Sequence, residues 1–311
     1  MKLAFVYAGQ GSQHVGMGQD FYEEFSEFAQ VFDHAPVDFD LKQLCFDGPE
    51  ERLSQTRYTQ PCMAAFAVGV TDLLYREGIR PRAAAGLSLG EYSALYAAGV
   101  FSRGAVISTV ALRGRAMEEA AAGLDCGMTA VLGLDRKKLQ TACSRAAELG
   151  VVQICNYNCP GQLVIGGEKE AVDRAGELAK ELGARRCMPL KVSGPFHTPL
   201  MKPAGDVLAA HFKTIGFGPM AFPVYFNCKG RPLEAGDTVP ALLEKQVQSP
   251  VYWEDTVRRM EADGIDTVVE IGPGKVLCGF FKKTAPGIKT WHIDTAADFH
   301  SVVSALKGAE V

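Results

Sequence analysis

The stretch Ala83-Ala-Ala-Gly-Leu-Ser-Leu-Gly-Glu-Tyr92 decides which fold this chain is predicted to adopt. A run of small residues over 82–86 predicts a strand, and residues 89–98 predict a helix. Between them, Gly86-Leu-Ser-Leu-Gly90 matches Gly-x-Ser-x-Gly, a sharp turn that lifts a serine hydroxyl above a sheet. The glycines permit the turn, and the N-terminal N–H groups of the helix favour developing negative charge. The stretch predicts Ser88 as a nucleophile; the alternative is an incidental serine in a small-residue turn.

The strands and helices around this stretch alternate along the chain, which favours a mainly parallel sheet. Further strands are predicted over 2–8, 265–271 and 288–293. Further helices are predicted over 18–33, from Pro61 to before Gly78, and over 102–122, 203–213, 239–248 and 253–263, with a short helix before the last strand.

A different pattern begins at Gly127. Strands are predicted over 128–133, 151–155, 162–165 and 184–190, and helices over 135–149 and 168–182. This βαββαβ order is typical of a ferredoxin-like unit. We therefore predict an α/β fold in which a mainly parallel, α/β-hydrolase-like large domain comprises residues 1–124 and 191–311. Residues 125–190 would form an inserted ferredoxin-like small subdomain.

The amino-acid composition limits which partners the protein is expected to bind and in which compartment it is expected to lie. The chain has 311 residues, 47% hydrophobic and 22% charged, with a net charge of −4 and no segment that concentrates Lys and Arg. We therefore expect neither nucleic acid nor a membrane surface as a partner, and no apolar run approaches the roughly 18 residues of a spanning helix. Nine scattered cysteines without a Cys-x-x-Cys indicate reduced thiols and a cytoplasmic protein. Nothing in the sequence demands more than a monomer.

A serine hydroxyl needs a base to become a good nucleophile. Of the six histidines, His197 lies in Ser193-Gly-Pro-Phe-His-Thr-Pro199, a rigid turn rather than a helix or strand face. It is the candidate base, and the alternative is a loop histidine with an ordinary backbone hydrogen bond. His211 and His300 are expected to be structural or surface residues.

Two polar residues fall on apolar helix faces. Arg113 lies on the same face as Val106, Val110 and Met117, and a buried guanidinium needs an anionic partner or a water-filled cleft. It is either part of a structural ion pair or a clamp for a substrate carboxylate. Gln246 lies on the apolar face of its own helix, and a buried amide there needs hydrogen-bond partners. It either holds two domains together or has a role in the active site.

Taken together, these stretches resemble the malonyl-CoA:acyl carrier protein transacylases over almost the whole chain. The resemblance is carried by Phe5-Val-Tyr-Ala-Gly-Gln-Gly-Ser-Gln13, Thr59-Gln-Pro61, Gly86 to Tyr92, Arg113-Gly-Arg115, Asn156-Tyr-Asn-Cys-Pro-Gly-Gln162, Val192-Ser-Gly-Pro-Phe-His197, Gln246 with Ser249-Pro-Val251, and Glu270-Ile-Gly-Pro-Gly274.

The resemblance implies a two-step exchange in fatty-acid synthesis. Ser88, deprotonated by His197, would take the malonyl group from malonyl-CoA and pass it to the phosphopantetheine thiol of acyl carrier protein. The backbone N–H groups of Gln10 and Leu89 would form the oxyanion hole, and Arg113 would bind the malonyl carboxylate.

Three further positions bear on the resemblance. Gln246 would orient His197 through its backbone carbonyl, so that no triad aspartate is needed. Phe196 resembles the residue of malonyl-selecting members, where a smaller side chain would leave room for a methyl branch. Leu87 departs from the pattern, because the family commonly has His before the nucleophile. That His supports the site and is not the base, so the resemblance implies the same reaction with Leu87.

Other functions share parts of these motifs. A free-standing polyketide acyltransferase would use the same chemistry with another carrier. A serine esterase or thioesterase of the α/β-hydrolase type would transfer the acyl group to water, but that class usually has an acid between Ser and His and lacks the inserted unit. A non-catalytic carrier-binding or scaffold protein is a further alternative. It would have no reason to keep four polar residues together, namely Ser88, His197, Arg113 and Gln246. No metal, phosphate-loop or dinucleotide motif is found, so neither a metal nor a bound cofactor is predicted.

Overall fold

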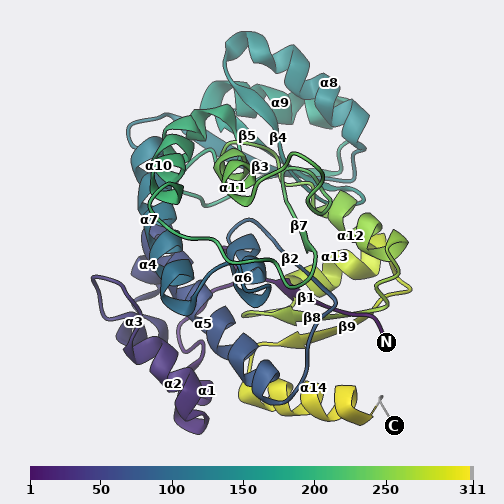
Figure 1. Ribbon diagram of the computed structural model, residues 1–311. Coiled ribbons are helices and arrows are strands. Elements are labelled where there is room, and N and C mark those ends of the chain that lie inside the picture. The colour runs from purple at the N-terminus through teal and green to yellow at the C-terminus, as the bar shows by residue number, and fades with distance from the viewer. Residues whose placement is uncertain (309–311) are drawn as a thin grey trace. The chain divides into compact units, whose positions relative to one another are not determined.

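A five-stranded parallel sheet carries the predicted nucleophile turn in the computed structural model, which describes residues 1–308 (Figure 1). The strand order is β7-β2-β1-β8-β9. The strands are β1 (Leu3–Tyr7), β2 (Ala83–Gly86), β7 (Val224–Tyr225), β8 (Thr267–Ile271) and β9 (Lys289–Ile293). Strands β1, β2 and β8 are buried at every residue, as is typical of a parallel sheet with both faces covered. The prediction of a mainly parallel sheet is confirmed.

The register of this sheet places three loops at one edge. Tyr7, the last residue of β1, pairs with Gly86 at the end of β2 and with Ile271 at the end of β8. The loops that follow these strands therefore leave the same edge of the sheet. Crevices at the carboxyl ends of parallel strands are the usual ligand sites of α/β folds, and Ser88 lies at this edge.

Eight helices among the described residues precede or follow these strands along the chain. They are α1 (Gln19–Glu24), α2 (Ser26–Asp33), α3 (Leu41–Asp47), α4 (Glu50–Leu53), α5 (Thr56–Arg76), α6 (Gly90–Ala97), α13 (Val276–Thr284) and α14 (Ala296–Gly308). Helix α6 packs against β1 and β2, and α13 and α14 pack against β9.

Two predicted helix boundaries are wrong. The helix expected over 18–33 is interrupted at Phe25, whose extended backbone (φ −120°, ψ 109°) separates α1 from α2. The Phe25 ring packs 5.4 Å from the Phe299 ring, so aromatic packing outweighs local helix propensity. The helix expected to begin at Pro61 begins earlier, at Thr56, and contains that proline. Thr56, Thr59 and Gln60, which precede the proline in the helix, are buried.

Residues 126–189 contain a four-stranded antiparallel sheet in the order β4-β5-β3-β6. Its elements follow the predicted βαββαβ order: β3 (Cys126–Leu132), α8 (Arg136–Ala146), the 3-10 helix η1 (Ala147–Leu149), β4 (Val152–Cys159), β5 (Gln162–Glu168), α9 (Lys169–Glu181) and β6 (Arg186–Pro189). Both helices pack on one face over a core that includes Val131, Leu139 and Ile165. The ferredoxin-like prediction is confirmed.

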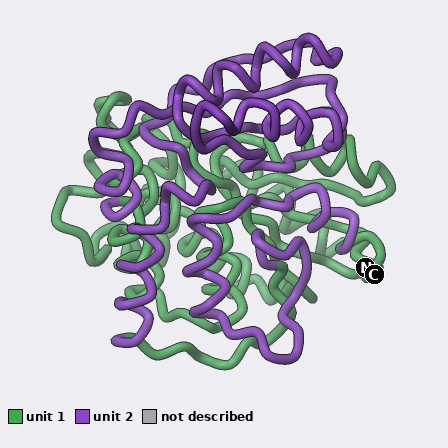
Figure 2. Tube along the Cα trace, turned by 90° about the horizontal axis from the view of Figure 1, so that it is seen from above, with its two compact units in different colours: residues 1–114, 215–225, 260–311 green, residues 115–214, 226–259 purple. Residues whose placement is uncertain are grey.

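The chain divides into two compact units, coloured separately in Figure 2. The first comprises 1–114, 215–225 and the residues from 260; the second comprises 115–214 and 226–259. Besides the antiparallel sheet, the second unit contains the 3-10 helix η2 (Pro199–Met201), α10 (Lys202–Phe212) and α11 (Val239–Val247), and the division falls within α7 (Arg103–Ala121) and α12 (Trp253–Ala262).

The boundaries of these units differ from those of the predicted domains. Every strand of the antiparallel sheet lies within 125–190, and every strand of the parallel sheet lies outside it. The second unit, however, also takes in 191–214 and 226–259. The domain boundaries at 124/125 and 190/191 stay a prediction.

Candidate active site

Ser88 occupies the turn between β2 and α6, as the Gly-x-Ser-x-Gly pattern predicts. Its backbone φ is 52°, a left-handed conformation that L-residues rarely adopt. The chain enters helix immediately afterwards, because Glu91 N–H donates to the Ser88 carbonyl and Tyr92 N–H to the Leu89 carbonyl. The turn leaves the half-buried hydroxyl at the carboxyl edge of the sheet.

Both glycines of the pattern are required by close backbone approach. A Cβ on Gly86 would lie 1.9 Å from the carbonyl carbon of Gly90, and a Cβ on Gly90 would lie 2.3 Å from the carbonyl oxygen of Tyr7. These distances are far below any tolerated contact, and backbone atoms cannot move aside as a flexible side chain can. The Gly-x-Ser-x-Gly pattern is thus a packing requirement between β1, β2 and α6.

The guanidinium of Arg113 lies beside the hydroxyl of Ser88. Arg113 is only 1% exposed on α7, and its Nη2 donates to Ser88 Oγ at 3.1 Å. Nη1 donates to Gln60 Oε1 at 2.8 Å, and the guanidinium carbon lies 5.4 Å from the ring centroid of Tyr92. Burial lowers the pKa of Arg113, and the neighbouring Tyr92 and Glu91 oppose that shift. An anionic group bound beside Ser88 would compensate the cost of this buried charge.

Sequence reasoning missed Gln60, the residue that holds Arg113. Its side chain is fully buried within α5, where an amide must find hydrogen-bond partners. The available signal was its place in Thr59-Gln60-Pro61, one of the stretches that carried the family resemblance. The partner itself lies 53 residues away along the chain, and local patterns give no pairing over that distance.

The two backbone N–H groups predicted to form the oxyanion hole lie in segments that leave the same edge of the parallel sheet. Leu89 N–H is at the start of α6, and Gln10 N–H is in the loop after β1. Neither donates a hydrogen bond to an acceptor within the part of the chain that the structure describes. The Gln10 side chain is held separately, because its Nε2 donates to Thr56 Oγ1 at 2.9 Å.

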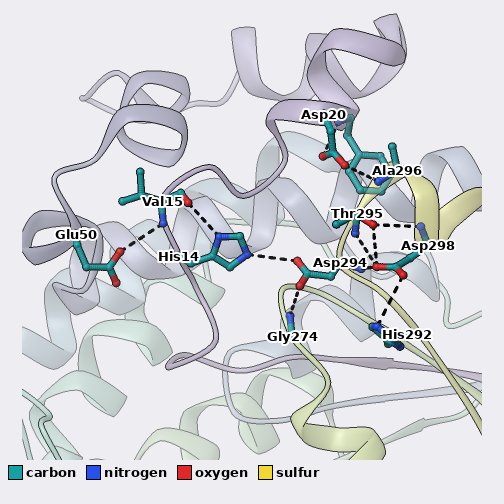
Figure 3. A network of polar contacts seen from close by, with 11 residues as sticks. His14, Val15, Asp20, Glu50, Gly274, His292, Asp294, Thr295, Ala296 and Asp298 are labelled. Carbon is teal, nitrogen blue, oxygen red and sulfur yellow. Dashed lines mark hydrogen bonds and ion pairs between the residues drawn. The ribbon is translucent and has the colours of Figure 1, made fainter.

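The loop that carries Gln10 is anchored by polar contacts (Figure 3). Ser12 Oγ donates to the Gly9 carbonyl at 2.9 Å. Val15 N–H lies 3.4 Å from a carboxylate oxygen of Glu50. His14 Nε2 lies 3.4 Å from Asp294, which also accepts from Gly274 N–H at 3.0 Å. Asp294 therefore links the loop after β1 to the loop after β8.

Leu87, the departure from the family pattern, leaves the turn intact. Its N–H donates to the Tyr7 carbonyl at 3.0 Å, and its carbonyl accepts from Gly90 N–H at 2.9 Å. A Cβ on Gly9 would lie 2.7 Å from the Leu87 carbonyl oxygen. The backbone of residue 87 thus fixes the turn, whatever side chain it carries.

His197, in the second unit, has the second unusual backbone conformation of the chain. Among the described residues, Ser88 and His197 (φ 62°) are the two non-glycine residues with positive φ. Such strain persists only where surrounding contacts impose it, and it concentrates at functional sites. Local backbone geometry therefore distinguishes the same two residues that sequence reasoning selected.

The imidazole of His197 is oriented by the C-terminal turn of α11. His197 is 3% exposed, and its Nδ1 lies 2.9 Å from the backbone carbonyl oxygen of Gln246. A carbonyl can only accept, so Nδ1 carries the proton and Nε2 is the basic nitrogen of the neutral ring. Carbonyls at a helix C-terminus carry partial negative charge, which favours the imidazolium formed when Nε2 takes up a proton.

Gln246 and Phe196 also lie in buried positions. The Gln246 side chain is fully buried, and its backbone carbonyl is the group that reaches His197. The Phe196 ring is 7% exposed, and a Cβ on Gly194 would lie 3.0 Å from it. Sequence reasoning missed Gln153 of β4, whose Nε2 donates to the His197 carbonyl at 2.9 Å.

The predicted residues thus fall into two groups. Ser88, Leu89, Gln10 and Arg113 lie in the first unit, where Arg113 contacts Ser88 directly. Phe196, His197 and Gln246 lie in the second, where His197 contacts Gln246. Within residues 1–308, no group of three or more His, Cys, Asp or Glu side chains is placed to hold a metal ion. No described helix is both long and apolar enough to cross a membrane.

Known proteins resemble this chain over most of its length. The family model of the acyl transferase domain matches residues 4–297. The malonyl CoA-acyl carrier protein transacylase of Bacillus subtilis is 39% identical over 98% of each chain. That of Escherichia coli K12 is 41% identical over 91% of this chain and 92% of its own.

Solved structures extend the likeness to three dimensions. The MCAT of Streptococcus pneumoniae is 42% identical and superposes with a TM-score of 0.93 over 98% of this chain and 100% of its own. A malonyl-transacylase solved in complex with its type II PKS acyl-carrier protein is 38% identical, with a TM-score of 0.94 over 98% of this chain and 100% of its own. The chain belongs to the malonyl CoA-acyl carrier protein transacylase family of acyl transferases.

Proposed function

We propose that this chain moves a malonyl group from malonyl-CoA to the phosphopantetheine thiol of acyl carrier protein, through a malonyl ester on Ser88. The pairing of Arg113 with Ser88 carries the proposal. A buried guanidinium 3.1 Å from a nucleophile suits an acyl group with a free carboxylate, because Arg binds carboxylates through two parallel hydrogen bonds. Malonyl is such a group, and acetyl is not.

In the first half-reaction, His197 Nε2 takes the proton of Ser88 as Oγ attacks the thioester carbonyl. The carbon–sulfur bond then breaks, and the CoA thiolate leaves with the proton from His197. In the second half-reaction His197 deprotonates the phosphopantetheine thiol, which attacks the malonyl ester and restores the Ser88 hydroxyl. The hydrogen bond from His197 Nδ1 to the Gln246 carbonyl supports this role, since it keeps Nε2 basic.

Each tetrahedral intermediate carries an oxyanion. We assign its two hydrogen bonds to Gln10 N–H and Leu89 N–H, with the N-terminal end of α6 adding favourable charge. Loss of one such donor typically slows acyl transfer about 100- to 1000-fold. Phe196 is assigned to limit the space beside the malonyl methylene, which would disfavour branched acyl groups.

The proposed chemistry uses side chains and backbone donors of this chain, so it needs no metal or redox cofactor. The proposal includes a cytoplasmic location. Nine cysteines that form no disulfide support it, because such thiols persist in reducing compartments.

Intact-mass measurement tests the nucleophile and the acceptor together. Exposure to malonyl-CoA should add one malonyl group to the wild-type chain, and Ser88→Ala should acquire none. Adding the phosphopantetheinylated carrier should remove the adduct and load the carrier. Rapid loss of the adduct to water, unaffected by the carrier, would instead indicate a thioesterase.

A second candidate carrier follows from the structural relative that was solved with a type II PKS acyl-carrier protein. The same chemistry would then serve a polyketide pathway rather than fatty-acid synthesis. Steady-state transfer to a fatty-acid carrier and to a polyketide carrier, measured side by side, separates the two by their kcat/KM values.

A further inference from the structure

We propose that Gln153 is a positioning residue for the general base: it holds the strained backbone of His197 so that the imidazole stays on the Gln246 carbonyl. This inference rests on the proposed function, because it assigns Gln153 a role in the reaction of His197. It adds a residue that neither the sequence motifs nor the resemblance singled out.

Hydrogen bonds from two different elements hold His197. From the end of α11, the Val247 carbonyl accepts from His197 N–H at 3.2 Å, and the Gln246 carbonyl lies 2.9 Å from Nδ1. From β4, Gln153 Nε2 donates to the His197 carbonyl at 2.9 Å. The bonds to His197 N–H and to its carbonyl flank the Cα at which φ is 62°. A non-glycine residue in this conformation is strained, so contacts on both sides of the Cα are needed to hold it there.

The position of Gln153 in β4 explains why its side chain is available. Val152 and Ile154 point into the core beneath α8 and α9. Because side chains alternate along a strand, Gln153 points to the opposite face of the antiparallel sheet. Gly166, its partner on β5, lies below the same loop: a Cβ there would be 3.5 Å from Thr198 Cγ2. The His197 loop therefore rests on this face of the sheet.

Loss of the Gln153 donor would act on the reaction through the imidazole. The His197 carbonyl belongs to a buried residue and would lose a hydrogen bond, and the strained φ would be less firmly held. Relaxation of φ rotates the Cα–Cβ bond and carries Nδ1 away from the Gln246 carbonyl. The ring then loses the contact that fixes which nitrogen is basic.

The test compares two shape-matched variants with a matched control. Gln153→Met removes the donor at nearly constant length, and Gln153→Glu replaces it with an acceptor. Gln140→Met makes the same change on the exposed face of α8 in the same subdomain. Three quantities are measured: the single-turnover rate of malonyl-enzyme formation with its malonyl-CoA dependence, the Tm, and the imidazole ¹⁵N shifts of labelled protein, assigned with His197→Gln.

We expect both Gln153 variants to form the malonyl-enzyme about tenfold more slowly or worse at saturating malonyl-CoA, with KM little changed. The ¹⁵N shifts of neutral His197 should lose the single protonated-Nδ1 signature of wild type. Gln140→Met should match wild type in both.

Two results would overturn the assignment. One is a Gln153→Met enzyme with wild-type rate and spectrum. The other is a rate loss accompanied by a lower Tm with the His197 spectrum unchanged, which would mean a purely structural role. If the wild-type chain itself forms no malonyl adduct, the proposed function fails, and the ¹⁵N spectra still decide whether Gln153 positions His197.

Discussion

The guanidinium of Arg113 donates a hydrogen bond to the hydroxyl of Ser88 across 3.1 Å, although Arg113 belongs to α7 and Ser88 to the turn between β2 and α6. This contact places a permanent positive charge beside the atom that would carry the acyl group. In the proposed function, this charge makes the site suited to an acyl group that carries its own carboxylate.

Arg113→Ala should slow malonyl transfer about 10- to 150-fold while preserving or improving acetyl transfer. A hydrogen bond to a charged group contributes about 1.5–3 kcal/mol. Malonyl would lose the bond between its carboxylate and Arg113, whereas acetyl has no carboxylate and loses nothing. The kcat/KM values for malonyl-CoA and acetyl-CoA measure the difference. Arg113→Met controls for the volume of this buried side chain, and an equal loss on both substrates would mean that the arginine is structural.

Gln60→Glu should weaken malonyl transfer more than acetyl transfer. The new carboxylate would stand 2.8 Å from Arg113 Nη1 and compete with the malonyl carboxylate for the guanidinium. A raised KM for malonyl-CoA, compared with Gln60→Met, is the expected result. A malonyl KM equal to that of wild type would show that Gln60 does not influence the clamp.

Gly86→Ala should destabilise the fold and remove activity together. Its Cβ would lie 1.9 Å from the Gly90 carbonyl carbon, a clash that only backbone displacement can relieve, at a cost of about 1–3 kcal/mol or more. Gly104→Ala is the matched control, since nothing lies within 4 Å of its Cβ in α7. Thermal unfolding and malonyl-enzyme formation should be lowered in the first variant and retained in the second.

Buried thiols should resist alkylation in the folded protein. Burial raises the pKa of the Cys143 and Cys278 thiols to about 12, so at neutral pH they are protonated, and the thiolate is the reactive form. Mass spectrometry after iodoacetamide treatment should find native labelling confined to the half-buried Cys126 and Cys187. All nine cysteines should react in urea, and rapid native labelling of Cys143 would contradict the burial described.

Much of the fold followed from local pattern. Alternating strands and helices predicted the parallel sheet, and the βαββαβ order predicted the second sheet. Helix α14 was not predicted, although a capping box marks its start: Thr295 Oγ1 accepts from Asp298 N–H at 3.2 Å, and Asp298 Oδ2 accepts from Thr295 N–H at 3.1 Å. The break at Phe25 could not be foreseen, because it depends on a ring far along the chain at Phe299.

The sequence by itself determined the sharp turn at Ser88, because the glycines that this turn needs lie two residues on either side of the serine. It also singled out His197, whose flanking Gly194, Pro195 and Pro199 mark a turn. Only the tertiary structure decided which groups hold these residues. Arg113 meets Gln60 across 53 positions of the chain, and His197 meets Gln153 across 44. Periodicity tells which face of an element is buried, but a buried polar atom finds its partner only when separate elements pack together.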